Sequence, residues 1–380
     1  MSSPSPVDEI DEAKEREHFR AVVNAFKYYK LCSLDRIHKS EKIISTLLPT
    51  HQRRLEKYTT YLTKFKKCLD VNNTIVHMII KDVDTMFENV DHSMDGVNGT
   101  ESFGCDYNAC EMISQKQHKM QHDVEKVQSV LKNIVRDWSS VGAPEREQCY
   151  KPILDEIEAL YSMEEYSERR GVKVLVPGAG LGRLAWEVAA RGFTCQGNEF
   201  SLFMLFASNF VLNRCPEANK YTVHPWLHQY VNNLTCDHQL QSVTFPDVRP
   251  ARDKPADSFS MTAGDFLKVY TEPEEWSCVA TCFFIDCAPN VIEFIERIYS
   301  ILQPGGYWIN LGPLLYHYSD MPTENSIEPP YDILLEIIRD VGFDIMKERT
   351  GVKTKYAQNP NSMMQHEYSS VYFVCRKPYC

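Results

Sequence analysis

Three glycines at alternate positions, Gly178, Gly180 and Gly182, separate a short apolar run from a helical pattern. Glycine permits tight turns and lets backbone N–H groups approach a ligand without an intervening Cβ. A strand, a glycine loop and a helix in this order favour a nucleotide-containing ligand. The stretch KVLVPGAGLGR, residues 173–183, therefore predicts a nucleotide-binding loop.

The spacing of these glycines separates two classes of cofactor. A nicotinamide dinucleotide fingerprint requires its third glycine where Arg183 stands, but here that glycine comes one residue earlier. Gly-x-Gly-x-Gly is the loop expected for S-adenosylmethionine, which has no pyrophosphate. Glu199 follows Gly178 by about 20 residues, where an acid binds ribose hydroxyls. We predict S-adenosylmethionine as the cofactor; an NAD-dependent reductase, and a surface role for Glu199, are the alternatives.

Further candidate residues lie near the ends of the next predicted strands. After SFSMTA, the carboxylate of Asp265 is expected to accept the adenine amino group, and the ring of Phe266 to cover the adenine. Asp286 ends the run VATCFFID and Asn290 follows it. Because ligands bind at the carboxyl ends of parallel strands, we expect both at the reacting end. Helix capping is the alternative for the two acids. Cys282 lies near enough to offer the cofactor a backbone contact.

These residues require a scaffold of alternating strands and helices. Between residues 172 and 377, short β-rich runs alternate with helical patterns. The helices are expected near 184–191, 202–213, 291–302 and 331–341. This alternation predicts an α/β fold with a mainly parallel, Rossmann-like sheet that is covered by helices on both faces.

The chain divides by pattern into a helical half and an α/β half. Residues 1–15 are rich in Ser, Pro and charge, which predicts a disordered tail. An all-helical domain is expected at 16–165, with a mobile loop at about 89–116. The cofactor-binding domain then covers 166–380, and an insertion at about 216–254 interrupts it.

The composition excludes several classes of protein. A net charge of -11 argues against a general nucleic-acid or anionic-membrane binder. There is no signal-peptide pattern and no apolar run long enough to span a bilayer. Most of the 13 cysteines are therefore expected to be free, buried thiols, and the protein is expected in the cytosol, with nuclear entry left open. No set of Cys and His has zinc-finger spacing, so we predict no metal site.

Several stretches together resemble the carnosine N-methyltransferase family. They are DWSSVGAPEREQCYKPI, VLVPGAGLGRLAWE, GNEFSLFML, AGDF, TCFFIDCAPN, NLGPLLYH and NSMMQHEYSSVYFVCRKP. The resemblance implies a seven-stranded class I methyltransferase sheet with one reversed strand, after a helical domain. It also implies methyl transfer from S-adenosylmethionine to the imidazole of carnosine (β-alanyl-histidine), which gives anserine.

The resemblance assigns further residues. Arg146 becomes a candidate for the carboxylate of the cofactor, with a surface salt bridge as the alternative. His317 and Tyr368, and more weakly Tyr356, become candidates to bind the dipeptide. One departure is Val176, which stands where methyltransferases usually carry an acid. The partner of the cofactor's amino group is thus left open.

The chemistry needs a neutral, correctly oriented imidazole. Since imidazole has a pKa of about 6.5, most of it is uncharged at neutral pH, and orientation is the main task. We expect Asp286 to accept one ring N–H, with Asn290 as its helper, so that the nitrogen nearer the side-chain attachment is methylated. Histidine methylation in longer peptides or proteins and a non-catalytic S-adenosylmethionine-binding scaffold are the alternatives. The helical region has enough apolar surface for a homodimer, although the sequence does not determine the oligomeric state.

Overall fold

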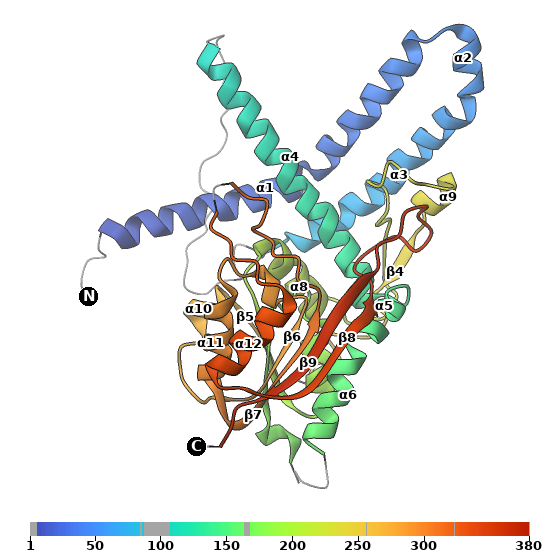
Figure 1. Ribbon diagram of the computed structural model, residues 1–380. Helices are drawn as coiled ribbons and strands as arrows, with labels where there is room; N and C mark the ends of the chain where they lie inside the picture. The colour runs from blue at the N-terminus through green and yellow to red at the C-terminus, as the bar shows by residue number, and fades with distance from the viewer. Residues whose placement is uncertain are drawn as a thin grey trace. The chain divides into compact units, whose positions relative to one another are not determined.

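The computed structural model describes residues 6–83, 86, 107–162, 168–255, 257–322 and 324–379 (Figure 1). The chain forms two compact units. The first comprises Met1–Lys132, Tyr221–Thr244 and Asn361–Met363, and the second comprises Asn133–Lys220, Phe245–Pro360 and Met364–Cys380. Compared with the expected boundary at residue 165, the sheet unit therefore begins earlier, inside a helix.

The first unit is mainly helical. It contains α1 (Pro6–Thr46), α2 (Pro49–Arg54), α3 (Glu56–Ile79), most of α4 (Tyr107–Trp138) and α9 (Cys236–Gln239). Its strands β3 (Tyr221–Val223) and β4 (Val243–Phe245) form a separate two-stranded sheet. Helix α1 begins at Pro6 and α4 at Tyr107, so the tail expected at 1–15 and the loop expected at 89–116 are both partly helical. The remainder of these two segments, 1–5 and 89–106, lies outside the described residues.

Residues 221–244 of the predicted insertion pack with the helices, because polar groups on α3 hydrogen-bond to them. The side-chain amide of Asn72 on α3 donates to the carbonyl of His224 at 2.8 Å and accepts from the His224 N–H at 2.7 Å. The hydroxyl of Tyr61 donates to Gln239 at 2.5 Å. These buried polar contacts assign residues 221–244 to the helical unit.

The second unit contains the predicted α/β sheet. Its seven strands run in the order β5-β2-β1-β6-β7-β9-β8. The strands are β1 (Lys173–Pro177), β2 (Thr194–Glu199), β5 (Phe259–Ala263), β6 (Trp276–Cys282), β7 (Leu302–Gly312), β8 (Asp344–Thr354) and β9 (Tyr368–Arg376). The helices are α5 (Ala143–Cys149), α6 (Lys151–Leu160), α7 (Arg183–Ala190), α8 (Leu202–Arg214), α10 (Phe266–Val269), α11 (Val291–Ile301) and α12 (Tyr331–Val341), with short 3₁₀ turns η2 (Arg169–Gly171) and η3 (Ile285–Cys287).

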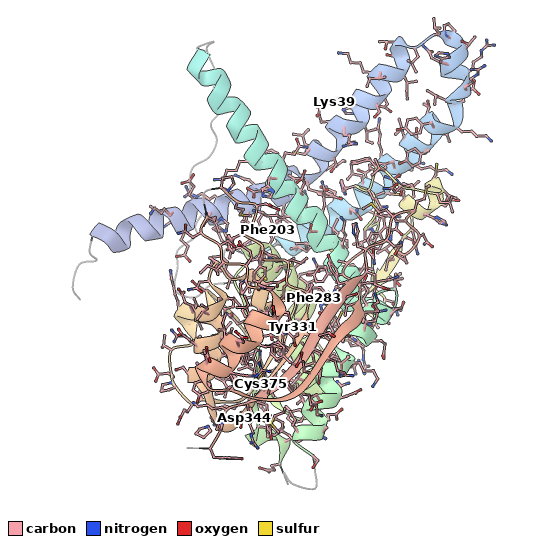
Figure 2. The ribbon with its side chains drawn as sticks, in the orientation of Figure 1. Lys39, Phe203, Phe283, Tyr331, Asp344 and Cys375 are labelled. Carbon is pink, nitrogen blue, oxygen red and sulfur yellow. The ribbon has the colours of Figure 1, made fainter. Side chains whose placement is uncertain are left out.

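Only β9 of these seven strands runs opposite to its neighbours. This confirms the predicted class I methyltransferase sheet. The sequence pattern did not reveal β8, which begins at Asp344 and is exposed along most of its length (Figure 2). As an edge strand it needs little apolar surface, since its backbone pairs with β9 on one side only.

The topology explains why the candidate residues gather. The parallel strands β1, β2, β5, β6 and β7 end at one edge of the sheet, and the reversed β9 begins there. Tyr368 therefore opens β9 at the same edge at which Glu199 ends β2. Within the described ranges, no helix combines the length and apolar character needed to cross a bilayer.

Candidate active site

The glycine loop has a backbone that only glycine adopts easily. Gly178 and Gly180 have φ values of 65° and 56°, in the left-handed region. A Cβ on Gly178 would also clash with the ring of Phe284. The N–H of Ala179 donates to the carbonyl of Asn198 at 2.8 Å, which ties the loop to β2. The glycine loop is therefore fixed next to the end of β2.

Glu199 supports this loop from the end of β2. Its Oε2 accepts the Gly180 N–H at 2.8 Å, and its Oε1 accepts the N–H groups of Phe200 at 2.9 Å and Ser201 at 2.8 Å. Burial raises the pKa of the Glu199 carboxyl, and the three N–H donors oppose that rise. A carboxylate has about four acceptor positions, so one remains for a ligand hydroxyl.

A cavity of ≈ 50 Å³ lies beside the loop, and two of its lining residues are a charged pair that sequence reasoning missed. Arg136 and Asp137, at the end of α4, are both almost fully buried. Oδ1 of Asp137 accepts from Arg136 Nη1 and from the Tyr150 hydroxyl, each at 2.8 Å. Oδ2 has no hydrogen-bond partner in the described part of the chain. It lies 4.0 Å from the point where a Cβ on Gly180 would stand.

The Asp137 carboxylate is a candidate for the acid that is missing at Val176. Val176 is buried in β1 and lines the same cavity without a charge. Asp137 instead supplies an acid from α4, at the glycine loop. The only signal in the sequence was the pair of opposite charges before Trp138, which also fits an ordinary salt bridge.

Arg146, whose contact with the cofactor carboxylate stays a prediction, is bonded in this structure to backbone carbonyls and to Asp247. Its Nη1 donates to the carbonyls of Arg136 at 2.7 Å and Ser139 at 2.8 Å, and its Nη2 donates to Asp247 at 2.5 Å. The last carbonyls of a helix lack partners within the helix, and Arg146 satisfies those of α4. Arg136, whose Nε has no hydrogen-bond partner among the described residues, lines the cavity in its place.

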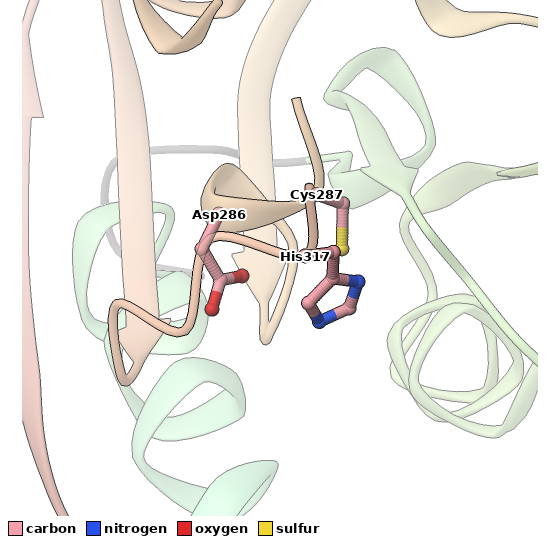
Figure 3. A group of neighbouring side chains, drawn as sticks. All are labelled: Asp286, Cys287 and His317. Atoms are coloured by element: carbon pink, nitrogen blue, oxygen red, sulfur yellow. The ribbon is translucent and has the colours of Figure 1, made fainter. Parts of the chain in front are cut away.

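Asp286, at the carboxyl ends of the parallel strands, is a buried acid with one unpartnered oxygen (Figure 3). It is 1% exposed, and its Oδ2 accepts the Leu315 N–H at 2.7 Å. Its Oδ1 is buried without a hydrogen-bond partner among the described residues. Burial raises the pKa of this carboxyl, while the Leu315 N–H and the nearby His317 oppose the rise. The His317 N–H also donates to the Asp286 carbonyl at 3.0 Å, which holds the two residues side by side.

Asn290 does not act as the expected helper of Asp286. Its Oδ1 accepts the Ile292 N–H at 3.1 Å, and its Nδ2 donates to Glu293 at 3.0 Å. It is therefore the N-cap of α11. The amide oxygen caps a free N–H at the start of α11, and the amide nitrogen bonds to Glu293 in the first turn of the same helix.

Three aromatic rings meet just beyond the end of β6. Phe283, which follows β6 directly and is labelled in Figure 2, lies 5.1 Å from the ring of Tyr356 and 5.8 Å from that of Tyr368. Cys282 and Tyr356 also line the cavity beside the glycine loop. The fold thus brings the two predicted tyrosines to Phe283, which lines the same cavity.

The chain matches a family model described as "Carnosine N-methyltransferase" over residues 113–379. It is 47% identical to carnosine N-methyltransferase unmet of Drosophila melanogaster, over 97% of this chain and 81% of that protein. It is 46% identical to the carnosine N-methyltransferase of Mus musculus, covering 97% and 88%, and 34% identical to that of Schizosaccharomyces pombe, covering 97% of both chains. The chain belongs to the carnosine N-methyltransferase family. It is an S-adenosylmethionine-dependent N-methyltransferase.

The residues around the loop fit this cofactor. Arg136 Nε has no hydrogen-bond partner among the described residues, although it lies 3.9 Å from Glu145 Oε2. Together with Asp137, whose Oδ1 is the oxygen that accepts from Arg136, it suits the carboxylate and ammonium of an amino acid. The remaining acceptor position of Glu199 suits a ribose hydroxyl. Asp265 caps α10, because its Oδ1 accepts the Leu267 N–H at 3.0 Å, and its other oxygen has no partner among the described residues.

Phe266 does not have the environment that the sequence analysis predicted. It is 3% exposed and packs against Phe284 and Phe294, with ring centroids 5.6 Å and 5.3 Å away. Its ring therefore belongs to the apolar core. An aromatic residue at a strand end is drawn inward when a cluster of rings is available to bury it.

We expect Glu199→Gln to weaken S-adenosylmethionine binding by roughly 10–150-fold, the range for losing a hydrogen bond to a charged group. The amide would place N–H donors against backbone N–H donors, so the loop as well as the ribose contact would suffer. Calorimetric titration measures the effect, and the melting temperature shows whether the variant is folded. A folded variant with wild-type affinity would contradict the assignment.

Proposed function

We propose that this enzyme transfers the methyl group of S-adenosylmethionine to an imidazole nitrogen of carnosine, giving anserine and S-adenosylhomocysteine. The names of its relatives in animals and yeast support carnosine as the substrate. The observation that carries the proposal is the buried, unpartnered Oδ1 of Asp286 at the sheet edge.

A buried acceptor without a donor costs about 1–3 kcal/mol. The N–H of a neutral imidazole removes that cost when it donates to Asp286 Oδ1. The bond fixes the tautomer and ring orientation, so that the lone pair of the other nitrogen is the one presented to the methyl donor. The carboxylate also stabilises the positive charge that the ring gains on methylation, while Oδ1 holds the remaining ring proton.

When bound, S-adenosylmethionine supplies a methyl group that its sulfonium charge already activates. Arg136 and Asp137 hold the amino-acid end, and Glu199 holds the ribose. The aromatic group of Phe283, Tyr356 and Tyr368 excludes water and favours a cationic ring beside it. His317, exposed next to Asp286, binds the dipeptide through its free ring nitrogens.

The test is incubation of the purified chain with methyl-labelled S-adenosylmethionine and carnosine. We expect one methyl group to be transferred, to the ring nitrogen nearer the side-chain attachment, as read by NMR of the product. Anserine, whose nearer nitrogen already carries a methyl group, serves as the control and should accept none. Absence of transfer to carnosine, or methylation of the other nitrogen, would contradict the proposal.

We also propose that the enzyme works in the cytosol. Ten cysteines of the described residues are free thiols, including exposed Cys236. Such thiols persist where the compartment is kept reducing.

A further inference from the structure

Three side chains of different chemistry meet at the reacting end of the site. Asp286, Cys287 and His317 each offer one metal-ligating atom, and these atoms all lie within 4.8 Å of one another. Figure 3 shows the His317 ring directly below the Cys287 thiol, with the Asp286 carboxylate to its left. Asp286 and Cys287 come from η3, and His317 comes from the segment after β7.

The donor atoms of this cluster are available. Asp286 Oδ1 is buried and has no hydrogen-bond partner among the described residues. Neither ring nitrogen of His317 makes a hydrogen bond within the described part of the chain. The Cys287 thiol makes only a weak contact with the Phe283 carbonyl, at 3.7 Å. An acidic group buried in this way calls for a cation or a proton donor.

The backbone around the cluster is already organised. The His317 N–H donates to the Asp286 carbonyl at 3.0 Å, and the Leu315 N–H donates to Asp286 Oδ2 at 2.7 Å. The Cys287 N–H donates to the Phe284 carbonyl at 2.9 Å. Outer contacts of this kind orient the ligands of metal sites and leave one carboxylate oxygen free for the ion.

We propose that Asp286, Cys287 and His317 form a zinc-binding site. Mixed oxygen, sulfur and nitrogen donors suit Zn²⁺, whereas Mg²⁺ and Ca²⁺ prefer oxygen alone. Tetrahedral Zn²⁺ with these ligands needs donor atoms roughly 3.3–3.8 Å apart, which small side-chain rotations reach from the observed spacing. On binding, the Cys287 thiol releases its proton to solvent and no group is oxidised or reduced. Three protein ligands leave the fourth position for water.

The consequence for activity is competitive inhibition. A zinc ion at Asp286 Oδ1 occupies the acceptor that the imidazole N–H requires; this step rests on the proposed role of Asp286. The cavity beside the glycine loop is lined by other residues, so S-adenosylmethionine binding is not blocked. Zinc therefore raises the KM for the imidazole substrate and leaves the affinity for the cofactor unchanged.

Direct binding is measured with Co²⁺ as the probe, without any substrate. We expect one Co²⁺ per chain, with a tetrahedral visible spectrum and a thiolate-to-cobalt charge-transfer band that Zn²⁺ removes. Cys287→Ser should abolish the charge-transfer band and weaken Zn²⁺ binding by about tenfold or more. Cys236→Ser, which removes an exposed thiol elsewhere, is the matched control and should leave both unchanged. An unchanged band in Cys287→Ser would overturn the proposal.

Inhibition is measured separately, at buffered free zinc concentrations because carnosine itself chelates metals through its imidazole. Cys287→Ser should raise the zinc inhibition constant about tenfold or more relative to Cys236→Ser. Loss of the charge-transfer band in Cys287→Ser together with normal methylation by Asp286→Asn would support the metal site. The same result would contradict the proposed role of Asp286. If Asp286→Asn is inactive but neither thiol variant changes Co²⁺ binding, only the metal site fails.

Discussion

Replacing Asp286 with alanine is expected to lower imidazole methylation by roughly 10²–10⁴-fold, the range for losing a group that orients and charge-stabilises a reacting imidazole. The carboxylate is 1% exposed, and its Oδ1 is without a partner among the described residues. Without that acceptor, the neutral ring has no group to select its tautomer. Since the proposed role of Asp286 is to hold the imidazole and not the cofactor, cofactor affinity should stay at the wild-type level.

Two further variants make this result interpretable. Asp286→Asn keeps an oxygen for the Leu315 N–H, so it tests the chemistry if the alanine variant folds poorly. Asn290→Ala, four residues along, removes the cap of α11 and should cost about 1 kcal/mol of stability with turnover retained. Turnover is followed by label transfer, and cofactor affinity by calorimetry. Wild-type turnover in a folded Asp286→Asn enzyme would show that the ring is oriented by another group.

Asp137→Asn is expected to lower the affinity for S-adenosylmethionine by roughly 10–150-fold. The free Oδ2 faces the glycine loop, where Val176 offers no charge to the ammonium of the cofactor. The amide is nearly the same size and its oxygen can still accept from Tyr150 and Arg136, but the variant also removes the charge that pairs with the buried Arg136. The melting temperature must therefore be compared with that of the wild type. Calorimetric titration of the folded variant gives the dissociation constant.

A ligand without the amino-acid end separates recognition from structural damage. 5′-Methylthioadenosine keeps the adenosine but lacks the ammonium, so its affinity should be the same for Asp137→Asn and for the wild type. Asp247→Asn is the matched control, because Asp247 pairs with Arg146 and Arg183 and does not line the cavity. If Asp137→Asn lost as much affinity for 5′-methylthioadenosine as for S-adenosylmethionine, Asp137 would have a structural role. A similar loss of S-adenosylmethionine affinity in Asp247→Asn would lead to the same conclusion.

Local patterns were enough to predict the parts of the site that lie on one strand and its turn. Gly178 and Gly180 require a left-handed backbone, which few other residues adopt, and this requirement is visible in the sequence. Glu199 and Asp286 follow or end strands whose carboxyl ends must meet at one edge of a parallel sheet. The mainly parallel character of the sheet also follows from this alternation, whereas the seven strands with one reversed were implied by the family resemblance.

Which groups around that edge are free for a ligand was decided only by the tertiary structure. Arg146 and Arg136 are both arginines near the end of α4, yet one is used by helix carbonyls and the other lines the cavity. Asn290 and Phe266 have suitable chemistry, but a helix start and an apolar core use them first. Residue type and spacing determine what a side chain can do. Its free donors and acceptors depend on neighbours that are distant in the chain, as the unpartnered oxygens of Asp137 and Asp286 show.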